Sequence, residues 1–335
     1  MAFNIRSMLT APSFFDKAAV QEGSRSWVFW GFVCGILGSI LFSTKAIFVK
    51  LGYADAELIP DPITVLSLRV LFAVPAYIIG LVWLNRHYNA QGKAKPTRKV
   101  IIPAFFLGML AYYGCALLDF TGLQYITAQL ERLLLFTYPG FVFLLGALFF
   151  GKPVSFKAIL CILLAYSGLL VIFWGGDITV GENVLLGSVL IVITAILFAL
   201  FQLLAKGTID KMGSLYFTCY GMIGATIAVL THFLIVNGGD ALANISQYSA
   251  RIYFLGFMLG VFCTILPTFM VNISIGRIGP QRVAILGMAS PIATVILAIM
   301  LLGEPFGPID ALGTALTMAG IALYSFVSRK PRPTG

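Results

Sequence analysis

The sequence predicts an all-α membrane protein of ten transmembrane helices, arranged as two inverted repeats of five helices each. Three observations lead to this prediction. Hydrophobic residues make up 59% of the 335 residues, whereas charged residues make up only 10%. Apolar runs recur along the chain at the length that a helix needs to cross a bilayer. Proline and glycine residues of the first half also recur, in the same order, in the second half.

The composition excludes an ordinary soluble domain. Soluble domains carry roughly 25% charged residues, whereas this chain carries 10% and has a mean hydropathy of +0.97. The formal net charge of +9 would suit a nucleic-acid binder if the Lys and Arg residues shared a solvated face. They lie instead in short segments between apolar runs, which is the membrane pattern. We therefore expect the lipid bilayer as a partner and no nucleic acid.

The sequence also lacks the motifs of metal and phosphate chemistry. No G-x-x-x-x-G-K-[ST] phosphate loop and no H-E-x-x-H occurs. The cysteines have no C-x-x-C spacing and no neighbouring histidine, so we expect them to pack as small apolar residues. We therefore expect no catalytic residues, no metal and no cofactor. The cysteines are Cys34, Cys115, Cys161, Cys219 and Cys263.

Ten runs are long and apolar enough to cross the hydrocarbon core as helices, which pair their own backbone groups. We expect residues 1–26 to form a cytoplasmic N-terminal tail and 329–335 a cytoplasmic C-terminal tail. Residues 27–175 would form the first repeat, and residues 184–328 the second. The predicted spans are 28–50, 62–84, 100–122, 126–149, 154–174, 184–206, 213–236, 251–275, 281–302 and 306–328.

The distribution of basic residues predicts the orientation. If the N-terminus is inside, the inner segments hold 17 of the 22 basic residues and the outer segments hold only Arg251. The remaining four, Lys45, Lys50, Arg69 and Arg132, lie within the spans. Because Lys and Arg accumulate in cytoplasmic loops, this bias places both termini inside and supports the count of ten.

The two halves repeat one another. Because each half has five spans, an odd number, the second half must enter the membrane from the opposite side. Inverted repeats are typical of secondary transporters, which bind their solute near the bilayer midplane between the repeats. The matched residues are Pro139 and Pro291, Pro153 and Pro305, Gly108 and Gly260, and Gly168 and Gly320, all 152 residues apart, with Gly31 and Gly187 at an offset of 156.

Residues 122–172 and 274–323 resemble the two halves of the drug/metabolite transporter superfamily, in its EamA-domain branch. Each stretch has an apolar helix with a proline (Pro139, Pro291), then a G-x-P turn, then a helix with a glycine near its end (Gly168, Gly320). The resemblance covers residues 27–328 and departs from the plainer family pattern at Glu131-Arg132. It implies a ten-helix inverted-repeat fold and transport of small organic solutes, often outward across the bacterial inner (plasma) membrane.

Five charged residues of the first half lie inside the predicted spans, away from their ends: Lys45, Arg69, Asp119, Glu131 and Arg132. The helical rise places all five within roughly 5–11 Å of the outer ends of their helices. In one interpretation they line a cavity. Arg69 or Arg132 would then hold a carboxylate, and Asp119 or Glu131 an amino group or a coupling proton. In the other, the charges neutralise one another and fix helix packing, or Lys45 snorkels to the surface.

The second half offers amides instead of charges. Gln202 and Asn272 lie toward the inner ends of their spans, where they could line the pathway or tie helices together. Tyr138 precedes Pro139, which should interrupt the helix. Together with Tyr112, Tyr113 and Phe136 it would form an aromatic cavity wall or pack in an ordinary way. The candidate substrate-binding residues are Lys45, Arg69, Asp119, Glu131, Arg132, Tyr138, Gln202 and Asn272, and Asp119 and Glu131 are also the candidates for proton coupling.

These features predict a secondary transporter that moves a small organic metabolite by alternating access. An amino acid or a related amphipathic solute, carried in the export direction, fits the mixed charges and the family resemblance. Two alternatives stay open, a membrane-embedded enzyme and a non-transporting membrane scaffold, and we expect no enzyme activity. The sequence leaves the driving ion and the oligomeric state open, with a homodimer as one possibility.

Overall fold

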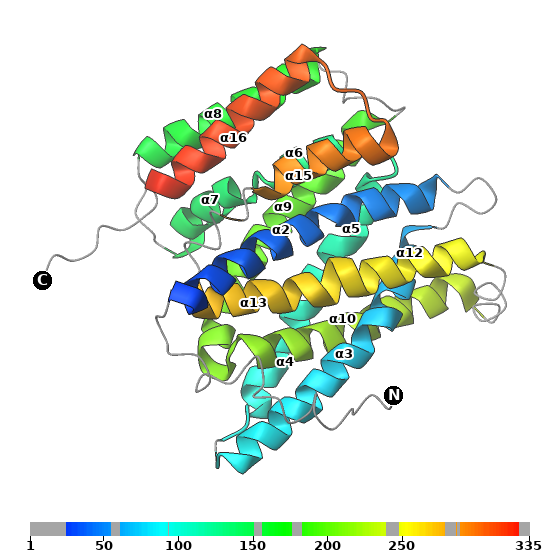
Figure 1. The fold of residues 1–335 in the computed structure, drawn as a ribbon, viewed down its shortest axis with the longest axis vertical. Coiled ribbons are helices and arrows are strands. Elements are labelled where there is room, and N and C mark those ends of the chain that lie inside the picture. Colours follow the sequence, from blue (N-terminus) through cyan, green and yellow to red (C-terminus); the bar gives the residue numbers. More distant parts are fainter. Residues whose placement is uncertain are drawn as a thin grey trace, which may run out of the picture.

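The structure is a computed structural model that describes residues 25–54, 61–92, 94–150, 156–175, 183–238, 248–278, 286 and 289–327 (Figure 1). Within these ranges the chain forms helices and no strand. The predicted tails lie outside these ranges, except that Arg25 and Ser26 already belong to the first helix. The all-helical prediction is thereby confirmed for the described part of the chain.

In the described part of the first repeat there are seven α-helical segments and one π-helical segment, η1. Their bounds are α2 (Arg25–Tyr53), α3 (Pro62–Ala90), α4 (Arg98–Gly108), η1 (Met109–Cys115), α5 (Ala116–Gly122), α6 (Ala128–Leu135), α7 (Tyr138–Phe150) and α8 (Phe156–Gly175). The second repeat follows the same order, with π-helical segments η3 and η4. Its elements are α9 (Val184–Met212), α10 (Ser214–Asn237), α12 (Ala250–Gly260), η3 (Val261–Ile265), α13 (Leu266–Ile278), α15 (Ala289–Leu297), η4 (Ala298–Leu302) and α16 (Pro308–Val327).

The helices have the length and composition of membrane spans. Large apolar side chains such as Leu148, Trp174 and Ile235 are exposed, as expected where lipid is the solvent. The protein is therefore an all-helical membrane protein, whereas the count of ten crossings stays a prediction. Among the residues that the structure describes, seven stretches are long and apolar enough to cross a membrane: Ser26–Tyr53, Pro62–Ala90, Arg98–Gly122, Ala128–Phe149, Val184–Met212, Ser214–Asn237 and Ala250–Val271. Three shorter apolar helices, Ile159–Gly175, Ser290–Leu302 and Pro308–Tyr324, coincide with the other predicted spans.

Several spans depart from a regular α-helix. The predicted span 126–149 is interrupted at Phe136 and Thr137, between α6 and α7, shortly before Pro139. Proline cannot donate a backbone hydrogen bond and clashes with the preceding turn, so the break lies where the sequence places it. In the third span of each repeat a π-helical segment follows the matched glycines Gly108 and Gly260 directly. Such π-helical segments frequently occur at functional sites.

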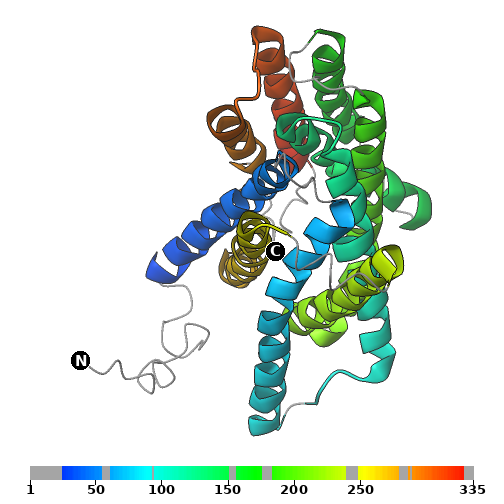
Figure 2. The same ribbon diagram turned by 90° about the vertical axis from the view of Figure 1, so that its right-hand side faces the viewer.

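Contacts between the repeats are reciprocal. α8 and α16 lie side by side at one end of the molecule (Figures 1 and 2). A Cβ atom on Gly168 would meet the Gly313 oxygen at 2.4 Å, and one on Gly320 would meet the Cys161 oxygen at 2.7 Å. Cys161 precedes Gly313 by the same 152 residues that separate Gly168 from Gly320. The same side-by-side contact is thus made twice, as a twofold relation between two repeats requires.

A second reciprocal pair joins the first helices of the repeats to the other half. Gly31 of α2 packs against Ile278 at the end of α13, and Gly187 of α9 packs against Ile126. Ile126 and Ile278 are again 152 residues apart. The helix pairs α2–α13 and α9–α5, α2–α15 and α9–α7, and α3–α12 and α10–α4 show the same exchange of repeats. The internal repeat is therefore visible in the packing as well as in the sequence.

Candidate functional site

A cavity of about 290 Å³ lies where helices of both repeats meet. A cavity of this volume suits a small solute of metabolite size. The second repeat contributes Thr194 and Phe198 of α9 and Ser290 of α15, and the first repeat contributes the rest of the wall. Five of the predicted site residues line this cavity: Lys45, Arg69, Asp119, Arg132 and Tyr138.

Lys45 of α2 lies between two carboxylates. Its Nζ donates hydrogen bonds to Asp119 Oδ2 of α5 and, at 3.4 Å, to Glu131 Oε1 of α6. The other oxygen of Glu131, Oε2, lies 3.7 Å from Nε of Arg132, and Nη2 of Arg132 donates to the backbone oxygen of Phe42 at 3.2 Å. Lys45 therefore pairs within the protein instead of snorkelling to the surface. The four charged side chains form one connected cluster.

Glu131 and Arg132 are adjacent in α6 and face different surroundings. Arg132 lines the cavity, whereas Glu131 is fully buried against Lys45 and Arg132. Neighbouring helical residues point about 100° apart, so this division follows from helix geometry. Glu131 and Arg132 thus add one cavity-lining cation and one buried carboxylate that pairs with it.

Arg69 of α3 stands apart from this cluster. Its Nε donates a hydrogen bond of 2.9 Å to Oγ1 of Thr264 in η3, and its guanidinium carbon lies 5.7 Å from the centre of the Phe120 ring. Thr264 itself donates to the backbone oxygen of Leu259 at 2.8 Å, which leaves a lone pair of its hydroxyl for Arg69. Arg69 is 8% exposed, and no ion pair within 4.0 Å joins it to a carboxylate of the described residues.

Aromatic side chains form much of the cavity wall. The Tyr138 ring packs edge to face on Phe198 at 5.2 Å, and its hydroxyl interacts with the Gln202 side chain. Gln202 therefore adjoins the cavity through Tyr138 without lining it. Tyr112 and Phe136 also line the cavity, whereas the Tyr113 hydroxyl lies 3.1 Å from Nδ1 of His232.

The side chain of Asn272 lies outside the part of the chain that the structure describes. The structure therefore brings together four of the predicted charges, places Arg69 on the same cavity, and attaches Gln202 to its edge.

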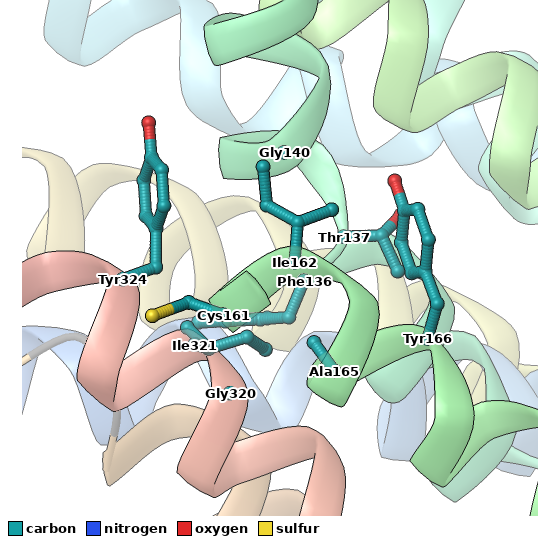
Figure 3. Close-up of a pocket in the computed structure, with 10 residues that line it drawn as sticks. All are labelled: Phe136, Thr137, Gly140, Cys161, Ile162, Ala165, Tyr166, Gly320, Ile321 and Tyr324. Carbon is teal, nitrogen blue, oxygen red and sulfur yellow. The ribbon is translucent and has the colours of Figure 1, made fainter. Parts of the chain in front are cut away.

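A second crevice lies beside the break between α6 and α7. Tyr166 and Tyr324 stand on either side of Ile162 there (Figure 3). Its space of about 10 Å³ holds about one water molecule, so it is too small for an organic solute. The larger cavity is therefore the better candidate site.

Two sets of polar contacts near the cavity were not predicted from the sequence. Ser43 Oγ of α2 lies 2.8 Å from both the hydroxyl and the backbone oxygen of Ser290 in α15. The Glu304 carboxylate accepts hydrogen bonds from the backbone N–H groups of Ala128 and Gln129, at 2.7 and 3.2 Å. Hydroxyls are too common in membrane helices to be singled out. The available signal for Glu304 was its place in the repeated G-x-P turn.

Lys50 and Glu304 hold the turn that leads into α6. Nζ of Lys50 donates to the backbone oxygens of Leu123 and Ile126, at 3.2 and 3.0 Å. Glu304, from the second repeat, caps the first two residues of α6. α6, which carries Glu131 and Arg132, is thereby positioned by both halves of the molecule.

Known proteins are similar to this chain over most of its length. The "Uncharacterized transporter YcbK" of Bacillus subtilis is 28% identical over 299 residues, which cover 89% of this chain and 92% of that protein. The "Uncharacterized transporter sll1319" of Synechocystis is 24% identical over 323 residues, covering 90% and 94%. A solved structure entitled "Crystal structure of protein" has the same fold, with a TM-score of 0.55 and 16% identity over 90% of this chain and 99% of that one.

A family model matches the chain twice, at residues 29–174 and 185–326. These two matches coincide with the repeats that the spacing of proline and glycine predicts, and with the two halves whose helices pack reciprocally around the cavity. The chain belongs to the EamA-like transporter family of the drug/metabolite transporter superfamily.

Proposed function

We propose that this protein is a secondary transporter that carries a small organic metabolite by alternating access, with the 290 Å³ cavity as its solute site. The main support is the cavity itself, which is walled by both repeats and lined by buried charged side chains. Charges within membrane helices are costly and are typical of solute and ion pathways. A site between two repeats can open to either side when the repeats rock against each other.

The solute we propose is amphipathic, such as an amino acid or a related compound, and the direction is export across a bacterial inner membrane with both termini in the cytoplasm. Charged groups share the cavity with aromatic and aliphatic walls, which favours a solute with a polar head and an apolar body. The bias of Lys and Arg toward one set of loops favours the orientation.

Proton exchange through Asp119 or Glu131 is the coupling that we propose. Both carboxylates contact the same ammonium of Lys45, so a proton that neutralises one of them would weaken its hold on Lys45. We expect Glu131→Gln to impair proton-driven transport while expression stays intact, and Arg69→Ala to impair transport of the solute. If both variants transport normally, the charged residues serve packing alone.

Solute counterflow in proteoliposomes tests the function. Vesicles loaded with unlabelled metabolites should take up the labelled form transiently if the protein is a carrier. Ala111→Trp would fill the cavity and should abolish counterflow, whereas Ile102→Trp, on the exposed face of α4, should not. Each variant must elute and unfold like the wild type. Absence of counterflow for every metabolite in a broad panel would favour a scaffold or a membrane-embedded enzyme instead.

A further inference from the structure

We propose that the cavity selects solutes with a net negative charge, and that Arg69 holds their carboxylate or another oxyanion. This inference rests on the proposed transport function, because it names the chemical class of the solute that would be carried. It is narrower than an amphipathic solute, since it assigns no partner to an ammonium group.

The Arg69 guanidinium makes fewer hydrogen bonds than it can donate. Among the described residues only its Nε is engaged by a hydrogen bond, to Thr264, and its guanidinium carbon lies 5.7 Å from the centre of the Phe120 ring. The two terminal nitrogens have no hydrogen bond to any described residue, although the side chain is nine-tenths buried and lines the cavity. An uncompensated buried cation is unfavourable. A planar oxyanion that accepts two parallel hydrogen bonds would satisfy it.

The charged side chains around the cavity do not balance. Lys45, Arg69 and Arg132 supply three positive charges, and Asp119 and Glu131 supply two negative ones, among the described residues at the cavity. Both carboxylates contact Lys45, and Glu131 also faces Arg132. The unmatched charge is therefore positive, and Arg69 is the cation without a carboxylate partner. A singly charged anion would bring the cavity to neutrality.

The acidic side chain at the cavity determines how well a solute's ammonium group can bind. Asp119 is the acidic side chain that lines the cavity, and its Oδ2 is already occupied by Lys45. Its other oxygen, Oδ1, is fully buried and has no hydrogen-bond partner among the described residues. A solute's ammonium group that bound Asp119 through Oδ2 would have to displace Lys45. We therefore expect a carboxylate to be required for binding and an amino group to contribute little.

Close helix packing and a hydrogen bond hold Arg69 in place. A Cβ atom on Gly260 would lie 2.8 Å from the Arg69 backbone oxygen, so α12 packs directly against α3 at this residue. Thr264, one turn further along in η3, fixes Nε. At the corresponding contact of the other half, Gly108 meets Gly221 instead of an arginine. The second repeat therefore offers no matching cation, and the site takes one anionic group.

The wall of the cavity suits a solute with an apolar body. Aromatic and aliphatic side chains make up much of the wall, so an apolar body beside the oxyanion would bury apolar surface. The cavity volume admits a body of about one ring. These wall residues are Phe42, Tyr112, Leu135, Phe136, Tyr138 and Phe198.

Four probes that share one phenyl body and differ in charge test the inference. They are 3-phenylpropanoate, 3-phenylpropanamide, 3-phenylpropylammonium and phenylalanine. Binding to the purified full chain is measured by calorimetry, and uptake of the same labelled probes is measured in proteoliposomes. The variants are Arg69→Gln, Arg69→Lys and Thr264→Val. The matched control is Arg86→Gln, which removes an exposed arginine from the same helix.

We expect the carboxylate to bind at least as tightly as phenylalanine, and the amide and the ammonium at least tenfold more weakly. Arg69→Gln should weaken carboxylate binding by about ten- to a hundredfold, the range for a lost hydrogen bond to a charged group. Arg69→Lys and Thr264→Val should weaken it less, and Arg86→Gln should not change it. If Arg69→Gln does not fold, the ordering of the other two variants against the control still decides.

Several results would overturn the inference: equal binding of amide and carboxylate, binding that is unchanged by both Arg69→Lys and Thr264→Val, or no binding of the carboxylate. The two proposals fail separately. Uptake of the amide or the ammonium without dependence on Arg69 would leave transport standing and remove the anion site. Carboxylate binding that depends on Arg69, without uptake in any proteoliposome experiment, would leave the anion site and remove the transport function.

Discussion

At the scale of single residues, Lys45 is the side chain that joins the two carboxylates at the cavity. Its ammonium contacts Asp119 and Glu131 together, from a helix on which no other charged side chain lines the cavity. A buried ion pair adds little net stability over apolar packing, but removal of one partner leaves a buried charge without compensation. Lys45 is therefore a residue whose loss can be measured as a change in stability.

We expect Lys45→Met to lower the free energy of unfolding by about 3 kcal/mol, because it leaves two buried carboxylates facing each other. The double variant with Asp119→Asn should recover part of that loss, since it removes one of the stranded charges. Denaturant titration in mixed micelles measures the free energy of unfolding of Lys45→Met, of Asp119→Asn and of the double variant. Losses of the two single variants that simply add in the double variant would show that Lys45 and Asp119 do not interact.

At the scale of helical elements, α6 is positioned by residues of both repeats. The Glu304 carboxylate accepts hydrogen bonds from the first two backbone N–H groups of α6, and Thr127 Oγ1 accepts from that of Leu130. A carboxylate at a helix N-terminus satisfies free N–H groups and complements the helix dipole. The turn between η4 and α16 thereby fixes the helix that carries Glu131 and Arg132.

For Glu304 we predict a graded loss of stability. Glu304→Ala should lower the free energy of unfolding by about 1–3 kcal/mol, because buried N–H groups lose their partner. Glu304→Gln keeps an acceptor oxygen and should lose less. Thermal unfolding of the purified variants orders them. A Gln variant that is as unstable as the Ala variant would mean that the carboxylate acts through something other than these hydrogen bonds.

Close helix packing gives a second test at this scale. A Cβ atom on Gly108 would lie 2.2 Å from the Gly221 Cα, so Gly108→Ala should separate α4 from α10 and cost about 1–3 kcal/mol of stability. The control is Gly207→Ala in α9, where nothing lies within 4 Å of a new Cβ and alanine is the better helix former. Equal stability of the two variants would contradict the packing described here.

At the scale of the whole molecule, the sequence predicted the repeats better than the site. Apolar runs and the 152-residue offset are long-range patterns, so they survive errors at single positions, and Gly168 and Gly320 do meet the opposite repeat. The grouping of Lys45 with Asp119 and Glu131 followed from their depth in the spans. The partners Thr264, Ser290 and Glu304 could not be predicted, because their contacts depend on how one repeat docks on the other.

The cavity between the repeats must open to both sides of the membrane if the protein works by alternating access. Cys115 lines this cavity and offers a native probe. In a protein that keeps Cys115 as its sole cysteine and still shows counterflow, we expect a membrane-impermeant thiol reagent to react from either face of the membrane, and bound solute to slow both reactions. Reaction from one face alone, while counterflow continues, would contradict a solute path through this cavity.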